Sequence, residues 1–221
     1  MAERRRTAVL ISGRGSNLQA LIESAARPGA SAEIALVVSN QPDAAGLERA
    51  QSTGIPTCLL EHRAFARRDE FERQLSRILQ VHDISLVCLA GFMRILGPDF
   101  VRGWWDRLLN IHPSLLPAFR GLDTHRQVIE AGVRFSGCTV HFVRPDVDAG
   151  PIIVQGVVPV EPGDTSDALD ARVLALEHRC YPLALELVAS GRARVEGERV
   201  IIDGAGWSDV ALIDPTGGSA A

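Results

Sequence analysis

The sequence contains no lysine, so all 23 basic side chains of this 221-residue chain are arginine. Schiff-base chemistry needs a lysine amine, and a Walker-type ATPase needs a lysine on the nucleotide phosphates. Both classes of protein are therefore excluded. Any phosphate that binds here must be held by backbone N–H groups, by arginine or by neutral side chains.

The chain also lacks paired cysteine motifs, long apolar runs and a basic charge balance. Its four cysteines show no CxxC spacing, which favours reduced structural thiols. The first apolar run, residues 7–11, is too short for a signal peptide or a membrane span. A net charge of −4 gives no electrostatic case for nucleic-acid binding. We therefore expect a cytoplasmic monomer or homodimer with no nucleic-acid or membrane partner.

Strands and helices alternate in the first half of the chain. Apolar segments predict buried strands at residues 7–11, 34–38, 57–60 and 86–90. Amphipathic segments predict helices from residue 18 to about 28, at 44–52 and at 67–81. This alternation predicts an α/β fold with a Rossmann-like, mostly parallel sheet flanked by helices, as far as about residue 111.

The second half has a different pattern. Strands at 138–143 and 152–158, separated by a short loop, predict an antiparallel C-terminal extension of the sheet. A long helix should begin at 166 or 167 with Thr165 as its cap, and Pro182 should kink it. A hairpin near 194–202 should follow, and 204–221 should be a weakly structured tail. The predicted core stripe of the long helix is Leu169, Val173, Leu176, Cys180, Leu183 and Leu187.

The most informative segment is Asn110-Ile111-His112-Pro113-Ser114-Leu115-Leu116-Pro117, which Asp148 follows later in the chain. Asn110 and His112 are two residues apart, so on an extended strand both side chains project from one face. A carboxylate at Asp148 could orient the imidazole and favour its charged form. A neutral donor, an acid and an orienting carboxylate suit stabilisation of the tetrahedral oxyanion formed during acyl transfer.

Each of these residues also has an ordinary structural explanation. A histidine near the end of an apolar strand is more often a hydrogen-bonded core or surface residue than a catalyst. Asn110 could cap a turn, and Asp148 could be an Asx-turn residue in its loop. Thr139 and His141, which alternate on the preceding strand, could face His112 and order a water, or could form a polar edge.

A glycine-containing turn gives the second chemical signal. Gly13 and Gly15 follow the first strand, and Ser16-Asn17 opens the next helix, so backbone donors there could bind an anion. Leu18 stands where a dinucleotide-binding fingerprint has its third glycine, and no acidic residue closes the second strand. A single phosphate therefore fits this turn better than NAD, although many such turns bind nothing.

Four motifs together resemble the phosphoribosylglycinamide formyltransferase family, over residues 7 to about 203. They are Ser12-Gly13-x-Gly15-Ser16-Asn17-Leu18-Gln19, Ala90-Gly91-Phe92-Met93-Arg94-Ile95-Leu96, the segment from Asn110 to Pro117, and Asp148-Ala149-Gly150-Pro151-Ile152. The resemblance implies formyl transfer from 10-formyltetrahydrofolate, as cosubstrate, to glycinamide ribonucleotide in purine synthesis, without a metal. It also implies a single formyltransferase domain over 1–203. About 7–105 would be the nucleotide-phosphate half and about 106–203 the folate-binding and catalytic half, with the active site between them.

The resemblance also assigns residues position by position. The implied catalytic residues are Asn110, His112 and Asp148. The implied ribonucleotide-binding residues are Gly15, Ser16, Asn17, Leu174, Ala175, Leu176 and Glu177, with Glu177 facing the amine. The implied folate-binding residues are Arg68, Met93, Arg94, Ile95, Leu96, Asn110, Arg144, Pro145, Asp146, Val147 and Asp148.

Three other functions remain alternatives. A formyltetrahydrofolate hydrolase would use the same three catalytic residues with water as nucleophile, but its relatives carry an added N-terminal domain. Methionyl-tRNA formyltransferase would need a basic C-terminal RNA-binding domain, which we do not expect after residue 203. A non-catalytic nucleotide-binding module would keep the fold and lose the chemistry, and the intact catalytic residues argue against it.

Two further expectations concern the surroundings of the site. The segment Ala118-Phe119-Arg120-Gly121 differs from that of relatives, which often have a lysine and a proline before the glycine, and we expect this loop only to flank the site. A metal site built from His112, His141 and Asp148 is conceivable, but the resemblance implies metal-free chemistry.

Overall fold

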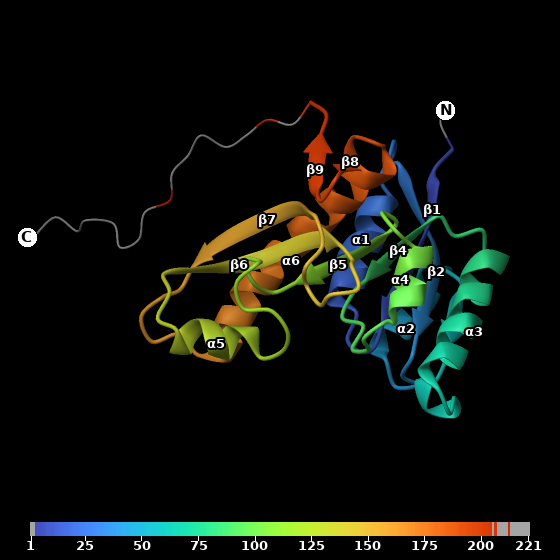
Figure 1. Ribbon diagram of the computed structural model, residues 1–221, viewed down its shortest axis with the longest axis horizontal. Coiled ribbons are helices and arrows are strands. Elements are labelled where there is room, and N and C mark those ends of the chain that lie inside the picture. The colour runs from blue at the N-terminus through green and yellow to red at the C-terminus, as the bar shows by residue number, and fades with distance from the viewer. Residues whose placement is uncertain (1–2, 205, 207–211, 213–221) are drawn as a thin grey trace, which may run out of the picture.

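One seven-stranded sheet organises the molecule, with strand order β3-β2-β1-β4-β5-β6-β7. The computed structural model describes residues 3–204, 206 and 212. Helices cover both faces of the sheet, and a separate two-stranded hairpin stands beside its antiparallel end (Figure 1). The α/β fold class predicted from the sequence is confirmed. The predicted tail at 204–221 lies almost wholly outside the described residues.

The first five strands of the sheet run parallel because a helix or helical turn follows each of the first four and returns the chain to the same edge. Their carboxyl ends therefore meet at one edge of the sheet, where α/β proteins place ligands. The strands are β1 Arg5–Ile11, β2 Ala32–Ser39, β3 Thr57–Leu59, β4 Leu86–Leu89 and β5 Leu108–His112.

The last two strands of the sheet are antiparallel, as their short connection predicts. Strand β6 (Phe135–Phe142) pairs antiparallel with both β5 and β7 (Ile152–Pro159). The C-terminal hairpin pairs β8 (Ala193–Glu196) with β9 (Arg199–Ile202) and forms its own sheet. The loop between β6 and β7 leaves the sheet beside the amino end of β5, where Phe142 pairs with Leu109.

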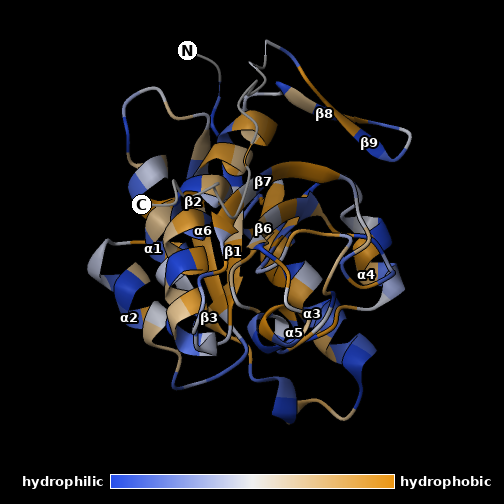
Figure 2. Ribbon diagram, turned by 90° about the vertical axis from the view of Figure 1, so that its left-hand side faces the viewer, coloured by the Kyte–Doolittle hydropathy of each residue, from blue (hydrophilic) through white to orange (hydrophobic). Residues whose placement is uncertain are grey.

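Two apolar cores form because each face of the sheet is covered by helices. One core packs α1, α2, α5 and α6 against the sheet, and the other packs α3 and α4 against the opposite face. Figure 2 shows the strands as mainly hydrophobic and α2 and α3 as hydrophilic on their outer sides. No helix in the described part of the chain is both long and apolar enough to cross a membrane. The helices are α1 Ser16–Ala25, α2 Ala45–Ser52, α3 Arg68–Val81, α4 Pro98–Gly103, α5 Thr124–Glu130 and α6 Ser166–Ala189, with a 3₁₀ turn at His62–Ala64.

Helix α6 begins where the sequence predicts and differs in its buried face. The Thr165 side chain accepts a hydrogen bond from the Ala168 N–H, which caps the helix as expected. Leu183, predicted to lie in the core stripe, is 50% exposed, so that prediction is wrong. Beyond Cys180 the buried residues include Tyr181, Ala184 and Val188, which lie to one side of the predicted stripe, while Leu187 of that stripe stays buried.

Tyr181 connects α6 to β4 and β5 in the middle of the sheet through hydrogen bonds. Its ring is fully buried, and its hydroxyl lies 2.9 Å from the Leu89 carbonyl oxygen and 3.2 Å from that of Leu109. These carbonyls belong to the last residue of β4 and to the residue before Asn110 on β5. A hydroxyl that serves both carbonyls therefore sets the distance between α6 and the strand that carries Asn110.

We expect Tyr181→Phe to lower the free energy of unfolding by about 1–2 kcal/mol, because it removes a buried hydroxyl without changing the ring. Urea denaturation followed by circular dichroism measures this change. A loss below about 0.5 kcal/mol, the range of ordinary surface substitutions, would show that the two carbonyl contacts do not hold α6 in place.

Candidate active site

Antiparallel pairing of β5 with β6 brings the central polar side chains together. Asn110 lies opposite His141 in this pairing, and His112 lies opposite Thr139. The β6–β7 loop then returns to the same place, so Asp148 reaches His112 although 36 residues separate them in the sequence. The three residues predicted to be catalytic therefore lie together at the carboxyl end of the parallel strands.

His112 is buried between two acceptors. Its Nδ1 lies 3.4 Å from Asp148 Oδ2, and its Nε2 lies 2.8 Å from the backbone carbonyl oxygen of Phe119. Each ring nitrogen therefore faces an oxygen that can accept a hydrogen bond. For Nε2 to donate a hydrogen bond to a substrate, its hydrogen bond with the Phe119 carbonyl oxygen must first break.

The loop after Pro117 takes part in the site, so the expectation that it only flanks the site is wrong. The Phe119 carbonyl oxygen contacts His112 Nε2, and the Gly121 N–H donates a hydrogen bond to Asp148 Oδ2 over 3.0 Å. Phe119 adopts a left-handed backbone conformation, with φ of 54°, which points its carbonyl back at the histidine. These contacts use backbone groups, and side-chain identity along the sequence carries no signal for them.

His141 is a site residue that the sequence indicated only as one of two alternatives. Burial lowers the pKa of His141, although Asp148 acts in the opposite direction from 3.8 Å away. The neutral ring can donate from Nδ1 to the Phe142 carbonyl oxygen, 2.9 Å away, which leaves Nε2 as an acceptor. Asn110 Nδ2 lies 3.4 Å from that nitrogen, so His141 orients the Asn110 amide. Thr139 instead donates to the Ser114 carbonyl, which is a structural role.

Residues predicted to bind folate line a small cavity beside the cluster, with a volume of about 130 Å³. The segment that follows β4, residues 90–96, forms one wall and is called the strand-end segment below. The β6–β7 loop forms the other wall. Of the predicted residues, the cavity lining includes Arg94, Ile95, Leu96, Asn110, Arg144, Pro145, Val147 and Asp148, and it does not include Arg68, Met93 or Asp146. Arg68 opens α3 and pairs with Glu72 at 3.7 Å, and Glu72 in turn accepts the Gly97 N–H at 2.7 Å. Arg68 is therefore linked to the far end of the strand-end segment.

The glycine turn forms a second cavity of about 290 Å³, at the amino end of α1. Gly15 has a φ of 72°, and a Cβ there would lie 2.7 Å from the Gly46 Cα, so a side chain does not fit. Ser16 and Asn17 follow as the first residues of α1, and Met93 also lines the cavity. The turn thus presents backbone N–H groups to an open space, as an anion site requires.

Glu177 joins α6 to this turn. Its carboxylate is 6% exposed and accepts a hydrogen bond from Asn17 Nδ2 over 2.7 Å. Burial raises the pKa of Glu177 to about 7, and the Asn17 contact limits that rise. Residues 174–177 were all predicted to bind the ribonucleotide. Among the described residues, Glu177 is the member of this segment that hydrogen-bonds to the glycine turn, through Asn17, whereas Leu176 packs against Gly156 on β7.

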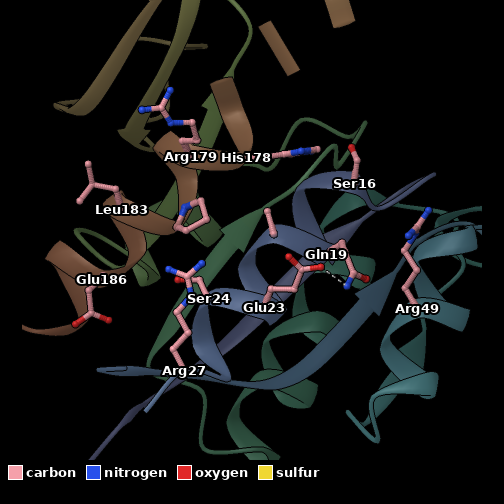
Figure 3. A pocket seen from close by; sticks show the side chains of 12 residues that line it. Ser16, Gln19, Glu23, Ser24, Arg27, Arg49, His178, Arg179, Leu183 and Glu186 are labelled. Atoms are coloured by element: carbon pink, nitrogen blue, oxygen red, sulfur yellow. Dashed lines mark hydrogen bonds between the residues drawn. The ribbon is translucent and has the colours of Figure 1, made fainter. Parts of the chain in front are cut away.

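A larger groove of about 640 Å³ begins at Ser16 and runs between α1 and α6. Figure 3 shows His178 pointing toward Ser16, with Arg49 on the far side and Arg27, Arg179 and Glu186 at the other end. Its charged lining is of both signs, and it includes none of the three central residues. Within the described residues, no group of three or more His, Cys, Asp or Glu side chains could hold a metal ion.

The chain is similar to known formyl transferases along most of its length. A family model described as formyl transferase matches residues 5–185. The phosphoribosylglycinamide formyltransferase of Escherichia coli (strain K12) is 45% identical over 209 residues, which cover 95% of this chain and 96% of that protein. The crystal structure of glycinamide ribonucleotide transformylase 1 from Symbiobacterium toebii matches with a TM-score of 0.89 and 46% identity, covering 91% of this chain and 95% of that one.

A higher identity is found to part of a longer protein. The trifunctional purine biosynthetic protein adenosine-3 of Gallus gallus is 53% identical over 190 residues, which cover 86% of this chain. The chain spans only 19% of the length of that protein. The similarity therefore concerns one part of the trifunctional protein.

Proposed function

The chain belongs to the formyl transferase family, and we propose that it transfers the formyl group of 10-formyltetrahydrofolate to the amine of glycinamide ribonucleotide. The observation that carries this proposal is the cluster of Asn110, His112 and Asp148 beside the cavity of the β6–β7 loop. The names of the E. coli and S. toebii relatives support the same reaction. The reaction would be a step of purine synthesis and would need no metal.

The two substrates would occupy the two cavities described above. The glycine turn from Gly15 to Asn17 would hold the ribonucleotide phosphate through backbone N–H groups, in keeping with a chain that has no lysine. Glu177 would face the amine from α6. The cavity between the strand-end segment and the β6–β7 loop would take the pterin ring of the folate. Bringing both substrates into one cleft removes much of the entropic cost of their reaction.

The chemistry assigned to the central residues is stabilisation of negative charge. Attack of the amine nitrogen on the formyl carbon forms the new C–N bond and moves an electron pair onto the formyl oxygen. Asn110 Nδ2 and protonated His112 would donate hydrogen bonds to that oxygen, and Asp148 would orient His112 and balance its charge. The amine then loses a proton, N10 of the folate gains one, and the C–N10 bond breaks as the carbonyl re-forms. His112 or a water would carry that proton.

A spectrophotometric assay tests the proposal directly. The purified protein is mixed with 10-formyl-5,8-dideazafolate, with and without glycinamide ribonucleotide, and release of the deformylated folate is followed. We expect release that depends on the ribonucleotide. Release without the ribonucleotide would replace the transferase with a hydrolase, and no release under either condition would favour a non-catalytic binding module.

A further inference from the structure

Arg144 is a cation held inside the protein at the start of the β6–β7 loop. Its residue is 7% exposed, and the guanidinium stacks on the Trp105 ring with 3.9 Å between the guanidinium carbon and the ring centroid. Its Nη2 donates to Asp106 Oδ1 over 2.8 Å, and its Nε donates to Glu198 Oε2 over 3.0 Å. An arginine is suited to such a site because its planar fork can stack and bind two carboxylates at once.

The three partners of Arg144 come from two places far from it in the sequence. Trp105 and Asp106 lie in the turn between α4 and β5, directly before the strand that carries Asn110 and His112. Glu198 lies in the turn of the β8–β9 hairpin. Arg144 therefore joins the β6–β7 loop to the base of β5 and to the C-terminal hairpin.

The other end of the same loop is fixed by close backbone packing. A Cβ at Gly150 would lie 1.7 Å from the Phe142 carbonyl oxygen, so the returning chain touches the end of β6. The Phe142 N–H also donates to the Pro151 carbonyl oxygen over 2.9 Å. Asp148 lies between Arg144 and this close contact of Gly150 with Phe142, and its backbone has a φ of 52°. Two attachments thus set the position of a short, strained segment.

We propose that Arg144 is a positioning residue for the formyl-donor site, and that the β8–β9 hairpin takes part in this role through Glu198. The proposal rests on the proposed function, because the loop that Arg144 holds is the one assigned to the folate. The guanidinium is engaged by Trp105, Asp106 and Glu198, and these contacts fix a cavity wall to which Arg144, Val147 and Asp148 all belong. A misplacement of about 1 Å in such a wall is enough to weaken binding or turnover strongly.

The test compares Arg144→Ala with a matched control, Arg172→Ala, in the full chain. Arg172 also binds two carboxylates, Asp164 at 2.8 Å and Glu161 at 3.2 Å, and it has no contact with the cluster. We expect Arg144→Ala to raise KM for 10-formyl-5,8-dideazafolate about tenfold, with KM for the ribonucleotide unchanged. Arg172→Ala should leave both KM values unchanged. A rise in the donor KM alone indicates that Arg144 positions the donor site, because a general loss of stability would change both KM values.

Two milder variants keep the proposal testable if Arg144→Ala does not fold. Arg144→Lys keeps the charge and loses the two-pronged geometry, and Glu198→Gln removes the hairpin's charge. Both should raise the same donor KM by about two- to fivefold. Donor KM values within about twofold of Arg172→Ala in every folded Arg144 and Glu198 variant would overturn the proposal. If the wild type shows no transfer, that result concerns the proposed function. Titration of the same variants with the dideazafolate by calorimetry then decides the role of Arg144.

Discussion

Asp148→Asn is expected to lower kcat for formyl transfer on the order of a thousandfold while both KM values stay within a few-fold of wild type. Asparagine keeps the size of the side chain, and its oxygen can still accept the Gly121 N–H that Asp148 accepts at 3.0 Å. That same oxygen faces His112 Nδ1, so the amide nitrogen would take the place of Oδ1, which faces His141 Nε2. The negative charge that would balance the His112 cation beside the developing oxyanion would then be lost.

The control for this variant is Asp164→Asn, because Asp164 is also a buried, hydrogen-bonded aspartate. Its side chain is 6% exposed against 10% for Asp148, and its partner is Arg172, outside the cluster. Both variants are assayed with saturating donor and ribonucleotide, and their folding is compared by thermal denaturation. A kcat for Asp148→Asn within a few-fold of that for Asp164→Asn would remove Asp148 from the catalytic role.

The fold could be predicted from the sequence because its strands differ sharply from their surroundings. Residues 86–90 are uninterrupted apolar residues, as in a strand buried on both faces, and β4 occupies Leu86–Leu89. The short helices α4 and α5 were not predicted, because six or seven residues carry too little periodicity. Leu183 is misplaced for another reason, since α6 carries apolar residues beside the predicted stripe as well as on it, and their spacing does not show which of them face the sheet.

The candidate site could be predicted as far as its chemistry lies in side-chain identity. Asn110, His112 and Asp148 were grouped from residue type, and the structure places them together. Two features could not be predicted. The Phe119 carbonyl is a backbone group placed by a left-handed residue, and every residue type carries a carbonyl. The partners of Arg144, Asp106 and Glu198, lie 38 and 54 residues away, and only tertiary packing brings them to it.

Glu177→Gln is expected to stabilise the protein at alkaline pH and to weaken ribonucleotide binding. Burial raises the pKa of Glu177 to about 7 in the folded protein, against an ordinary value of 4.5. The folded state therefore binds this proton more tightly than the unfolded state does. Its contribution to stability is fully present below pH 4.5 and is lost as pH rises through about 7. Glutamine has no charge to bury, and its oxygen can still accept the Asn17 hydrogen bond.

We expect Glu177→Gln to unfold with a free energy higher than wild type by about 3 kcal/mol at pH 8, and equal to it near pH 4. Urea denaturation across this range measures the difference. KM for the ribonucleotide should rise at least about tenfold at pH 8, because the carboxylate that would face the amine is gone. The wild-type KM should approach that of the variant as pH falls below 7, where Glu177 itself becomes neutral.

Glu186→Gln, on the same helix, is the control for KM, since Glu186 binds Ser31 at the end of the α1–α6 groove away from Ser16. If Glu177→Gln gains stability at pH 8 and the ribonucleotide KM is unchanged, burial of the carboxylate does destabilise the folded protein. Glu177 then does not contact the substrate amine. If KM rises without a gain in stability, Glu177 binds the amine without the penalty of burial that its position implies. A gain in stability together with a loss of affinity would show that the fold tolerates an unfavourable buried carboxylate because the substrate's amine needs it.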